Sequence, residues 1–393
     1  MALSLPQDTA ASPDVARTLG DLSEVREATL ALVAHLDDAT LQRTLSPIMS
    51  PLAWDLAHIA AYEDLWLTHR LAGLPLLRPD LAALYDAFET PRAVRGEIDL
   101  LDAPAARAYL RDVRERVCET LARTGTGDGV LCELVLRHEL QHTETMRQTM
   151  ALAGILPPGE PPPALQRWAA ADEPSSAQPA GAADSLDAES SWVELPSASF
   201  AMGAPAAGFA YDNERPRHTV QLAAFQIARR PVSNASWLSF SEGGGYRRRE
   251  WWSDEGWAWK EEYDIAHHPG VETGDPQAPA CHISWFEADA FARAHGARLP
   301  TEAEWERAAT SNQLAQTRRV WEWTSSRFDG YPGFAAYPYR EYSEVFFGND
   351  YLVLRGGSWA TDRRVASVTF RNWDYPQRRQ IFAGVRLARE ATS

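Results

Sequence analysis

A proline-rich segment divides this chain of 393 residues into two parts with different hydrophobic patterns. Residues 154–191 hold seven prolines among many Ala, Ser and Gly residues. A segment of this composition buries too little apolar surface to fold alone, and it is typical of a semi-rigid linker. We therefore expect a first domain at residues 14–155, a linker at 156–190 and a second domain at 191–391.

The first domain is predicted to be helical, because its apolar residues recur at the spacing of a helix. Ser50 and Pro51 favour the start of one of these helices, since Ser caps helix N-termini and Pro suits the first helical position. The pattern covers residues 25–38, 51–73, 105–123 and 130–152. Four helices of this length, with a longer loop at residues 74–103, fit an antiparallel four-helix bundle.

The second domain shows short strand-like runs between clusters of Gly, Pro, Asp and Asn, which indicates an irregular α+β fold. Twelve of the 15 tryptophans follow residue 190, so large aromatic rings are expected to fill a core with little regular structure. Helices are expected only at residues 233–241, 284–295 and 301–310. The last of these opens with the capping sequence T-x-x-E.

Composition excludes several classes of protein. The 38 basic and 54 acidic residues give a net charge of −16, which is unfavourable for general nucleic-acid binding. No apolar run approaches the ~20 residues of a membrane span, and no secretory signal is visible. The three cysteines are widely spaced and form no disulfide framework. A reducing cytoplasm is therefore the expected location, with no membrane and no nucleic acid as partner.

The strongest chemical signal is the sequence His138-Glu139-Leu140-Gln141-His142. Two histidines at i and i+4 project from one face of a helix and can bind one metal ion. Zinc proteases share this spacing and use the glutamate as base, but residues 143–150 supply no third ligand in the expected place. His58, on the second predicted helix, offers a third imidazole. Such a set leaves open metal positions, as at non-haem iron sites, but spacing alone does not choose iron over zinc.

Other polar clusters are weaker signals. Arg92 and Arg95 lie on the long loop, and paired arginines suit a carboxylate, although this signal taken alone favours an ordinary solvated loop. Residues 371–374 and the pair Arg378-Arg379 stand in an apolar C-terminal stretch, where burial requires pairing or ligand contact. The tyrosine-rich run 331–347 offers either phenolic hydroxyls for chemistry or rings for packing.

Taken together, these segments resemble the sulfoxide synthases of ergothioneine biosynthesis. WDLAHI and RHELQHTETM resemble the DinB-like helical domain of that family. The second domain resembles the formylglycine-generating-enzyme (sulfatase-modifying factor) fold, which is C-type-lectin-like. Its motifs are FAMGAP, CHISWFEADAFA, RLPTEAEWERAA, VWEWTSS, LRGGSWAT and GVRLAR. The lectin-like fold alone serves many functions, so the combination of both domains makes the resemblance specific.

The resemblance implies an activity. The family is described as non-haem Fe(II) enzymes that use O2 to join a thiol to C2 of the imidazole of hercynine, as a sulfoxide. It implies that His58, His138 and His142 bind Fe(2+), and that Gln141 and Trp373 bind hercynine. A tryptophan face beside a trimethylammonium group is a cation–π contact, which agrees with that role for Trp373.

The thiol donor also follows from the resemblance. The forms RNWD and YPYREYSEVFF resemble the mycobacterial-type enzymes, whose donor is γ-glutamylcysteine and whose product is γ-glutamyl-hercynylcysteine S-oxide. Arg92 and Arg95 would then bind the carboxylates of the donor, and Asp374 and Arg378 would form a second substrate-binding set.

That branch of the family uses an active-site tyrosine as proton donor, a general-acid role. Tyr339 is the residue expected to fill it, with Tyr337 and Tyr342 as alternatives.

Two departures from the family pattern and several alternatives stay open. The connection Asn312–Arg319 is shorter than is usual, and Cys281 is the only cysteine after residue 190, which disfavours a copper–cysteine oxidase. The alternatives are a paralogue that uses cysteine or a selenosugar, a non-catalytic lectin-like binding protein, and a zinc hydrolase with Glu139 as base.

Overall fold

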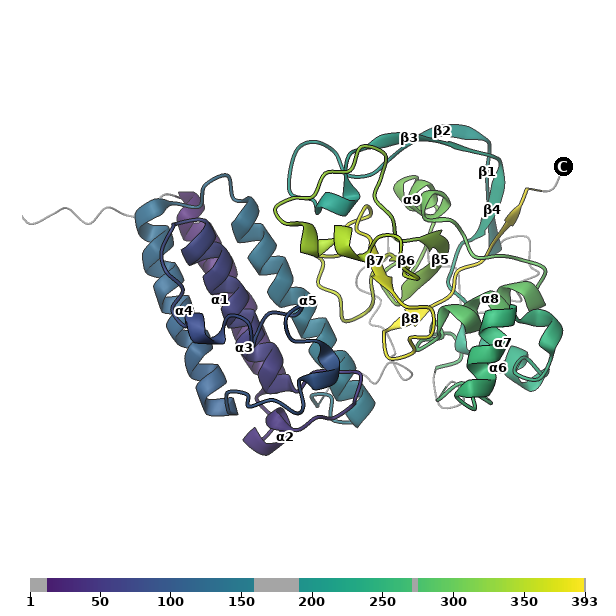
Figure 1. The fold of residues 1–393 in the computed structure, drawn as a ribbon. Coiled ribbons are helices and arrows are strands. Elements are labelled where there is room, and N and C mark those ends of the chain that lie inside the picture. Colours follow the sequence, from purple (N-terminus) through teal and green to yellow (C-terminus); the bar gives the residue numbers. More distant parts are fainter. Residues whose placement is uncertain (1–12, 159–190, 271–274, 392–393) are drawn as a thin grey trace, which may run out of the picture. The chain divides into compact units, whose positions relative to one another are not determined.

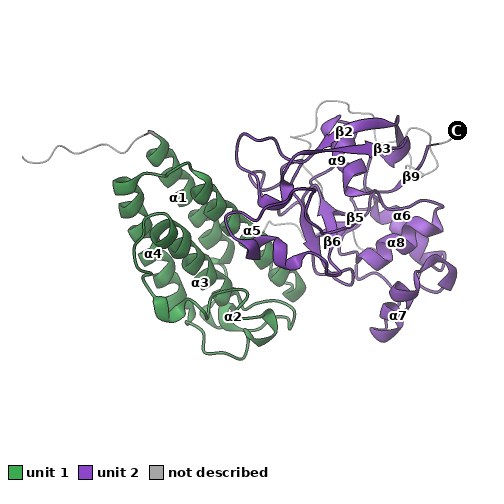
Figure 2. Ribbon diagram, turned by 45° about the horizontal axis from the view of Figure 1, so that its top comes forward, with its two compact units in different colours: residues 1–159 green, residues 160–393 purple. Residues whose placement is uncertain are grey.

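The computed structural model describes residues 13–158, 191–270 and 275–391. The chain forms two compact units, Met1–Gly159 and Glu160–Ser393 (Figure 2). Nearly all of the predicted linker lies outside the described residues, and the domain boundaries given above stay a prediction. None of the described helices is long and apolar enough to cross a membrane.

Unit 1 is a helical bundle, as the hydrophobic periodicity predicts (Figure 1). Its helices are α1 (Pro13–Val33), α2 (Asp38–Gln42), α3 (Leu52–Glu63), α4 (Ala103–Thr124) and α5 (Val130–Ala153). The long loop between α3 and α4 carries two short helices, η2 (Pro79–Leu81) and η3 (Arg92–Val94). Helix α3 packs against both α4 and α5, and α1 packs against α5.

The ends of the bundle helices follow ordinary capping chemistry. The Asp102 side chain accepts a hydrogen bond from the Ala105 amide at the start of α4. Gly154 ends α5 in the left-handed conformation that glycine adopts without strain. Helix α3 does not end at Glu63 but continues into a π-helical turn, η1 (Asp64–Arg70). Such turns are rare and often accompany functional sites, and the periodicity of the sequence does not reveal this one.

Four charged side chains, one from each long helix, meet inside the bundle. Arg26 of α1 donates to Glu63 of α3 at 2.7 Å and to Glu139 of α5 at 2.8 Å. Arg114 of α4 donates to Glu63 at 2.6 Å and lies 3.3 Å from Glu139. Two positive charges therefore balance two negative charges where little water enters, the condition that makes buried ions tolerable. This charge cluster links α1, α3, α4 and α5 to one another.

The described residues of unit 2 form three small sheets (Figure 1). The first has the order β1-β4-β9 and is antiparallel, so it joins the start of the unit to its end. The second is the antiparallel pair β2-β3, and the third has the order β7-β6-β5-β8, with only β5 and β8 parallel. The strands are β1 (Trp192–Leu195), β2 (Ala198–Met202), β3 (His218–Leu222), β4 (Phe225–Ala228), β5 (Trp321–Arg327), β6 (Leu352–Arg355), β7 (Asn372–Asp374), β8 (Ala383–Gly384) and β9 (Ala388–Glu390).

Among its described residues, unit 2 also contains four longer helices and several single turns. They are α6 (Asn234–Glu242), α7 (Asp254–Glu262), α8 (Trp285–Ala294) and α9 (Glu302–Thr310), with short helices η5 (Asp212–Glu214), η6 (Arg249–Trp251), η8 (Arg340–Tyr342) and η9 (Glu344–Phe346). Helices α6, α8 and α9 match the three expected ones. Helix α7 was not expected, because Gly256 in its first turn resembles a loop residue. Ser253, which caps α7 through the Gly256 amide, was the available signal.

Tryptophans fill the core of unit 2, in agreement with the composition. Trp237, Trp305 and Trp323 are fully buried. The indole N–H of Trp323 donates to the Ile283 carbonyl at 2.8 Å, and that of Trp305 donates to the Glu322 carboxylate at 2.5 Å. The fold class predicted from the sequence, a helical domain followed by an α+β domain, is confirmed.

Candidate metal centre

Unit 1 brings three imidazole rings together, from His58 of α3 and from His138 and His142 of α5. One ring nitrogen from each lies within 4.8 Å of the other two. Within the described ranges no other group of three or more His, Cys, Asp and Glu side chains converges in this way. The Nε2 atoms of His58 and His138 are 3.1 Å apart. Nitrogens bound to one ion at about 2.1 Å lie roughly 3 to 3.5 Å from one another, so the set fits a single transition-metal ion.

His58 is held by the long loop. Its Nδ1–H donates to the backbone carbonyl of Tyr85 at 2.6 Å, which leaves the Nε2 lone pair toward the other histidines. Its ring stacks on Trp54 with centroids 4.6 Å apart. Burial, followed by the proximity of His142, lowers the pKa of His58 well below its usual value. The ring is therefore neutral, as a metal ligand must be.

The two histidines of α5 have different neighbours. The Nδ1 atom of His142 lies 3.1 Å from a carboxylate oxygen of Asp55, on α3. The ring of His138 stacks on the ring of Tyr62, with centroids 3.6 Å apart. Burial lowers the pKa of His138 well below its usual value, so this ring is neutral too.

Glu139, the residue that would be the base of a zinc hydrolase, is already bound on both oxygens. One oxygen accepts from Nε of Arg26 at 2.8 Å, and the other accepts from Nη2 of Arg26 at 3.1 Å. Its side chain is 1% exposed. A general base must reach the proton that it removes, and a carboxylate held inside the charge cluster does not. The geometry therefore argues against the hydrolase alternative.

Arg95 is buried, whereas Arg92, three residues earlier in η3, is exposed. The guanidinium of Arg95 donates to three acceptors: the Thr90 carbonyl, the Ser50 hydroxyl and the Ala87 carbonyl. An arginine carries five N–H groups, so two remain for a further acceptor.

Arg95 also lies over the ring of Trp54, 3.4 Å from its centroid, while Trp54 stacks on His58. Burial lowers the pKa of Arg95 to about 10, and the charge of Asp55 opposes this shift. The side chain remains a cation at neutral pH. Arg95, Trp54 and His58 thus form one continuous stack from the loop to the histidines. Gln141, also on α5, is half-buried.

In unit 2, Trp373 of β7 belongs to a cluster of aromatic rings. Phe328 stacks on Trp373 with centroids 4.0 Å apart and an interplanar angle of 8°, so it covers one face of the indole. Tyr342 meets the indole edge-on at 6.0 Å, and Phe346 lies at 5.3 Å. A cation would therefore have to use the face of Trp373 that Phe328 leaves uncovered.

Asp374 and Arg378 lie beside one another, with Oδ1 of Asp374 3.6 Å from Nε of Arg378. The other oxygen of Asp374 accepts from the Gln380 amide at 3.4 Å. Both charged side chains are half-buried. Asp374 directly follows Trp373 on β7, and it forms a loose ion pair with Arg378.

The three candidate tyrosines differ in their surroundings. Tyr342 stacks on Tyr211 with centroids 4.4 Å apart, and Tyr339 meets Tyr342 edge-on at 6.2 Å. Tyr337 is 54% exposed, whereas Tyr339 is half-buried. Asp212 holds the segment in place by accepting from the Ser343 hydroxyl at 2.5 Å and from the Tyr337 amide at 3.3 Å.

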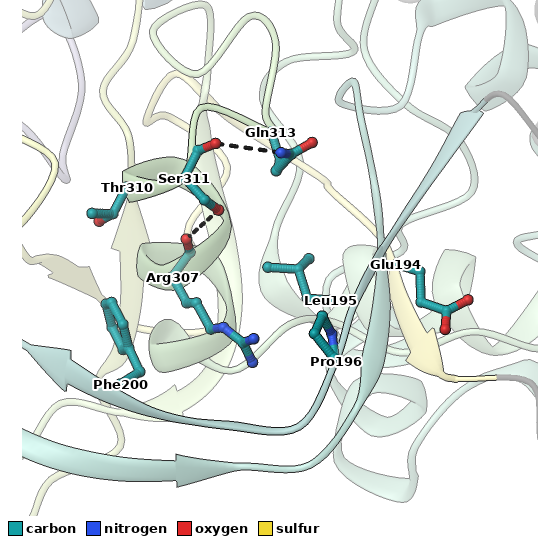
Figure 3. Close-up of a pocket in the computed structure, with 8 residues that line it drawn as sticks. All are labelled: Glu194, Leu195, Pro196, Phe200, Arg307, Thr310, Ser311 and Gln313. Carbon is teal, nitrogen blue, oxygen red and sulfur yellow. Dashed lines mark hydrogen bonds between the residues drawn. The ribbon is translucent and has the colours of Figure 1, made fainter.

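Four further residues lie around the histidines and were not predicted from the sequence: Trp54, Asp55, Tyr62 and Tyr85. The available signal for Asp55 was its place three residues before His58, an acidic side chain on the same face of a very apolar helix. Tyr85 contributes only its backbone carbonyl, for which no sequence signal exists. Unit 2 also has a surface pocket of about 440 Å³, in which the Arg307 side chain points toward Leu195 and Pro196 while Glu194 points away from them (Figure 3). None of the predicted site residues lines it.

The two units match two sequence profiles. The profile of the DinB superfamily matches residues 21–146. That of the Sulfatase-modifying factor enzyme 1-like domain matches residues 179–318 and 319–391. The second match is broken at the end of the short connection Asn312–Arg319, which agrees with a deletion there.

Curated relatives resemble nearly the whole chain. Hercynine oxygenase of Mycolicibacterium thermoresistibile is 39% identical over 96% of this chain and 96% of its own length. Hercynine oxygenase of Mycolicibacterium smegmatis is 39% identical over 94% of this chain and 98% of its own. Ergothioneine biosynthesis protein 1 of Schizosaccharomyces pombe is 23% identical over 70% of this chain and 41% of its own. These matches confirm the resemblance inferred from the motifs, and the chain belongs to the hercynine oxygenase family of oxygenases.

Proposed function

We propose that this protein is the sulfoxide synthase of ergothioneine biosynthesis, which joins γ-glutamylcysteine to C2 of hercynine to form γ-glutamyl-hercynylcysteine S-oxide. Each turnover consumes one O2. One of its oxygen atoms enters the S-oxide, and the other forms water with the two hydrogens lost from C2 and from the thiol. The observation that carries the proposal is the convergence of His58, His138 and His142. The names of the relatives supply the substrate, hercynine, and the pathway.

The proposed cofactor is Fe(2+), held by the three imidazoles. When bound, this ion supplies one-electron activation of O2 and open coordination positions for the substrates. The Tyr85 carbonyl and the Asp55 carboxylate hold His58 and His142 with Nε2 toward the centre. Neutral rings add no negative charge of their own, so the ion keeps its attraction for a thiolate ligand.

Arg92 and Arg95 are proposed to bind carboxylates of γ-glutamylcysteine. An exposed guanidinium and a buried one with two N–H groups left are suited to carboxylate oxygens. Because the Arg95 guanidinium is already fixed by its three acceptors and by Trp54, it loses little entropy on binding a ligand. Gln141 is proposed to donate to or accept from hercynine, as the resemblance implies.

Trp373, Asp374 and Arg378 are proposed substrate-binding residues of unit 2. The rings of Tyr342 and Phe346 beside Trp373 support a cation–π role toward the trimethylammonium group. Asp374 complements an ammonium, and Arg378 complements a carboxylate, both of which γ-glutamylcysteine carries. Tyr339 is proposed to give a proton from its phenol during the reaction.

The test is turnover of the purified full chain. The protein is loaded with Fe(II) without air, mixed with hercynine and either γ-glutamylcysteine or cysteine, and exposed to O2. Consumption of O2 and the product mass are recorded. We expect the S-oxide conjugate of γ-glutamylcysteine, and we expect His138→Ala to bind no iron and to form no product.

Three outcomes would overturn the proposal. Turnover with cysteine alone would make the protein a paralogue with another donor. Iron-loaded protein that consumes no O2 with any thiol would support a binding protein. Zinc-dependent hydrolysis without thiol-dependent O2 uptake would support a hydrolase.

A further inference from the structure

The three histidines of the centre differ in what lies behind each ring. His58 donates from Nδ1 to a neutral backbone carbonyl, that of Tyr85. His138 has the face of an aromatic ring, Tyr62, stacked against it. Among the described residues, only His142 of the three has a carboxylate, that of Asp55, within hydrogen-bonding distance of Nδ1.

Asp55 is an unusual residue for its place. It lies on α3 among apolar side chains and is 1% exposed. Its Oδ1 atom is 3.1 Å from Nδ1 of His142, while its Oδ2 atom is buried and has no hydrogen-bond partner in the described part of the chain. Leaving a buried polar atom unmatched costs free energy, typically about 1 to 3 kcal/mol. The carboxylate therefore does not serve stability alone.

Trp54 and Arg95 belong to the same arrangement. Trp54, the residue before Asp55, carries Arg95 on one face and stacks on His58. The interaction of Asp55 with the Arg95 charge is favourable. The negative charge of Asp55 is therefore partly compensated by a fixed cation, while its Oδ1 atom lies against Nδ1 of His142.

We infer that Asp55 is a positioning residue that makes His142 the most electron-donating of the three histidines. By accepting from Nδ1–H, it keeps Nε2 of His142 toward the centre, and its negative charge strengthens the electron donation of this ring alone. A carboxylate behind a ligating histidine has both effects at metal sites. The inference rests on the proposed binding of a metal ion by these histidines.

The variant Asp55→Asn separates the effect of the negative charge on His142 from the effect of the side chain's shape. The asparagine side-chain oxygen still accepts from Nδ1–H, so the ring keeps its orientation, but the negative charge is gone. We expect metal affinity to fall about ten-fold, the lower end of what such partners contribute. We also expect the Fe(III)/Fe(II) potential to rise, because less negative charge stabilises the oxidised ion.

Asp64→Asn is the matched control. Asp64 follows directly on α3, is also 1% exposed, and accepts from the Thr68 hydroxyl and from the Leu77 amide at 2.7 Å. Within the described part of the chain, its side chain binds Thr68, Leu77 and Arg116 and none of the three histidines. If Asp55 acted on stability alone, both variants would affect unfolding and neither would affect the metal.

The experiment titrates the full chain with Co(2+) without air and records the visible absorption bands of the bound ion, the dissociation constant and the unfolding temperature. We expect Asp55→Asn to bind Co(2+) about ten-fold more weakly and with shifted absorption bands. Asp64→Asn should match the wild type in both its dissociation constant for Co(2+) and its absorption bands. Asp55→Glu, which keeps the charge, is the second variant in case Asp55→Asn does not fold, and it should retain more affinity than Asp55→Ala.

The outcomes distinguish this inference from the proposed function. Equal dissociation constants and identical bands for the wild type, Asp55→Asn and Asp55→Ala would overturn the role of Asp55 while leaving the metal centre intact. A wild-type protein that binds neither Co(2+) nor Fe(2+) would overturn the metal centre itself, and the role of Asp55 with it.

Discussion

The guanidinium of Arg26 binds both carboxylate oxygens of Glu139, through Nε at 2.8 Å and through Nη2 at 3.1 Å. The two residues are far apart in the sequence, on α1 and α5, and both are buried. Glu139 directly follows His138, so this pair connects α1 to the helix that carries two of the three histidines.

Glu139→Gln is expected to destabilise unit 1 strongly, because it leaves Arg26 and Arg114 with a single carboxylate, Glu63. Breaking a buried ion pair from one side typically costs about 3 to 5 kcal/mol. Urea unfolding followed by circular dichroism measures the change. The double variant Arg26→Met/Glu139→Leu, which removes both charges, should recover part of the loss. A Glu139→Gln protein as stable as the wild type would contradict the importance of this pair.

Arg95→Lys is expected to destabilise the protein by about 2 to 3 kcal/mol, since a lysine cannot reproduce three directed hydrogen bonds and the stack on Trp54. Arg92→Ala, at an exposed position, should change stability by less than ~0.5 kcal/mol. Under the proposed function, Arg92→Ala should instead raise the KM for γ-glutamylcysteine and leave that for hercynine unchanged. Thermal unfolding measures the structural role of Arg95, and steady-state kinetics measure the substrate-binding role of Arg92. A large loss of stability in Arg92→Ala would argue against this division.

Tyr339→Phe is expected to lower kcat by about 100-fold or more, because a general acid contributes a factor of this size. Stability should change little, since the phenylalanine ring keeps its contact with Tyr342. Tyr337→Phe and Tyr342→Phe are the comparison variants, and both should turn over faster than Tyr339→Phe. If one of them shows the larger loss instead, that tyrosine is the proton donor.

His282 is expected to make stability fall in acid. Burial lowers the pKa of His282 from 6.5 to about 4. As the pH drops through this interval, the unfolded chain takes up a proton that the folded chain does not, so the free energy of unfolding decreases. His282→Asn removes the titrating ring while tolerating the positive φ of 64° at this position. Its unfolding temperature should therefore depend less on pH between about 6.5 and 4, and an unchanged dependence would exclude His282 as a source.

Gly356→Ala is expected to destabilise unit 2 by more than ~1 kcal/mol, since it combines two unfavourable effects. Gly356 has a φ of +95°, and an added Cβ atom would collide with the backbone carbonyl of Thr317. Thr317 belongs to the short connection Asn312–Arg319, so the variant tests whether this connection packs firmly on the LRGGSW segment. Gly348→Ala, where φ is +71° and no atom lies near, separates backbone strain from collision. Equal losses of stability in both variants would show that the connection moves aside and does not pack firmly on the LRGGSW segment.

Much of the fold was available from local patterns in the sequence. The helical period defined α3, α4 and α5 closely, because each helix shows its buried stripe in its own residues. The i, i+4 spacing placed His138 and His142 on one face of α5, and the expected bundle offered His58 of another helix as the third ligand, a role that the resemblance also implies. The helical period did not predict α7, which has a glycine in its first turn and only the cap Ser253 as a signal, or the π-helical turn after Glu63.

The partners of the site residues were decided only by the tertiary structure. Nothing local to Glu139 indicates that Arg26, on another helix, occupies both of its oxygens. In the same way, Asp55 gains its place behind His142, and Arg95 its place on Trp54, only when α3, α5 and the long loop pack together. Spacing along one helix is a property of a few consecutive residues, and the sequence determines it directly. A contact across the bundle depends on the rotation and packing of every helix, and the fold as a whole decides it.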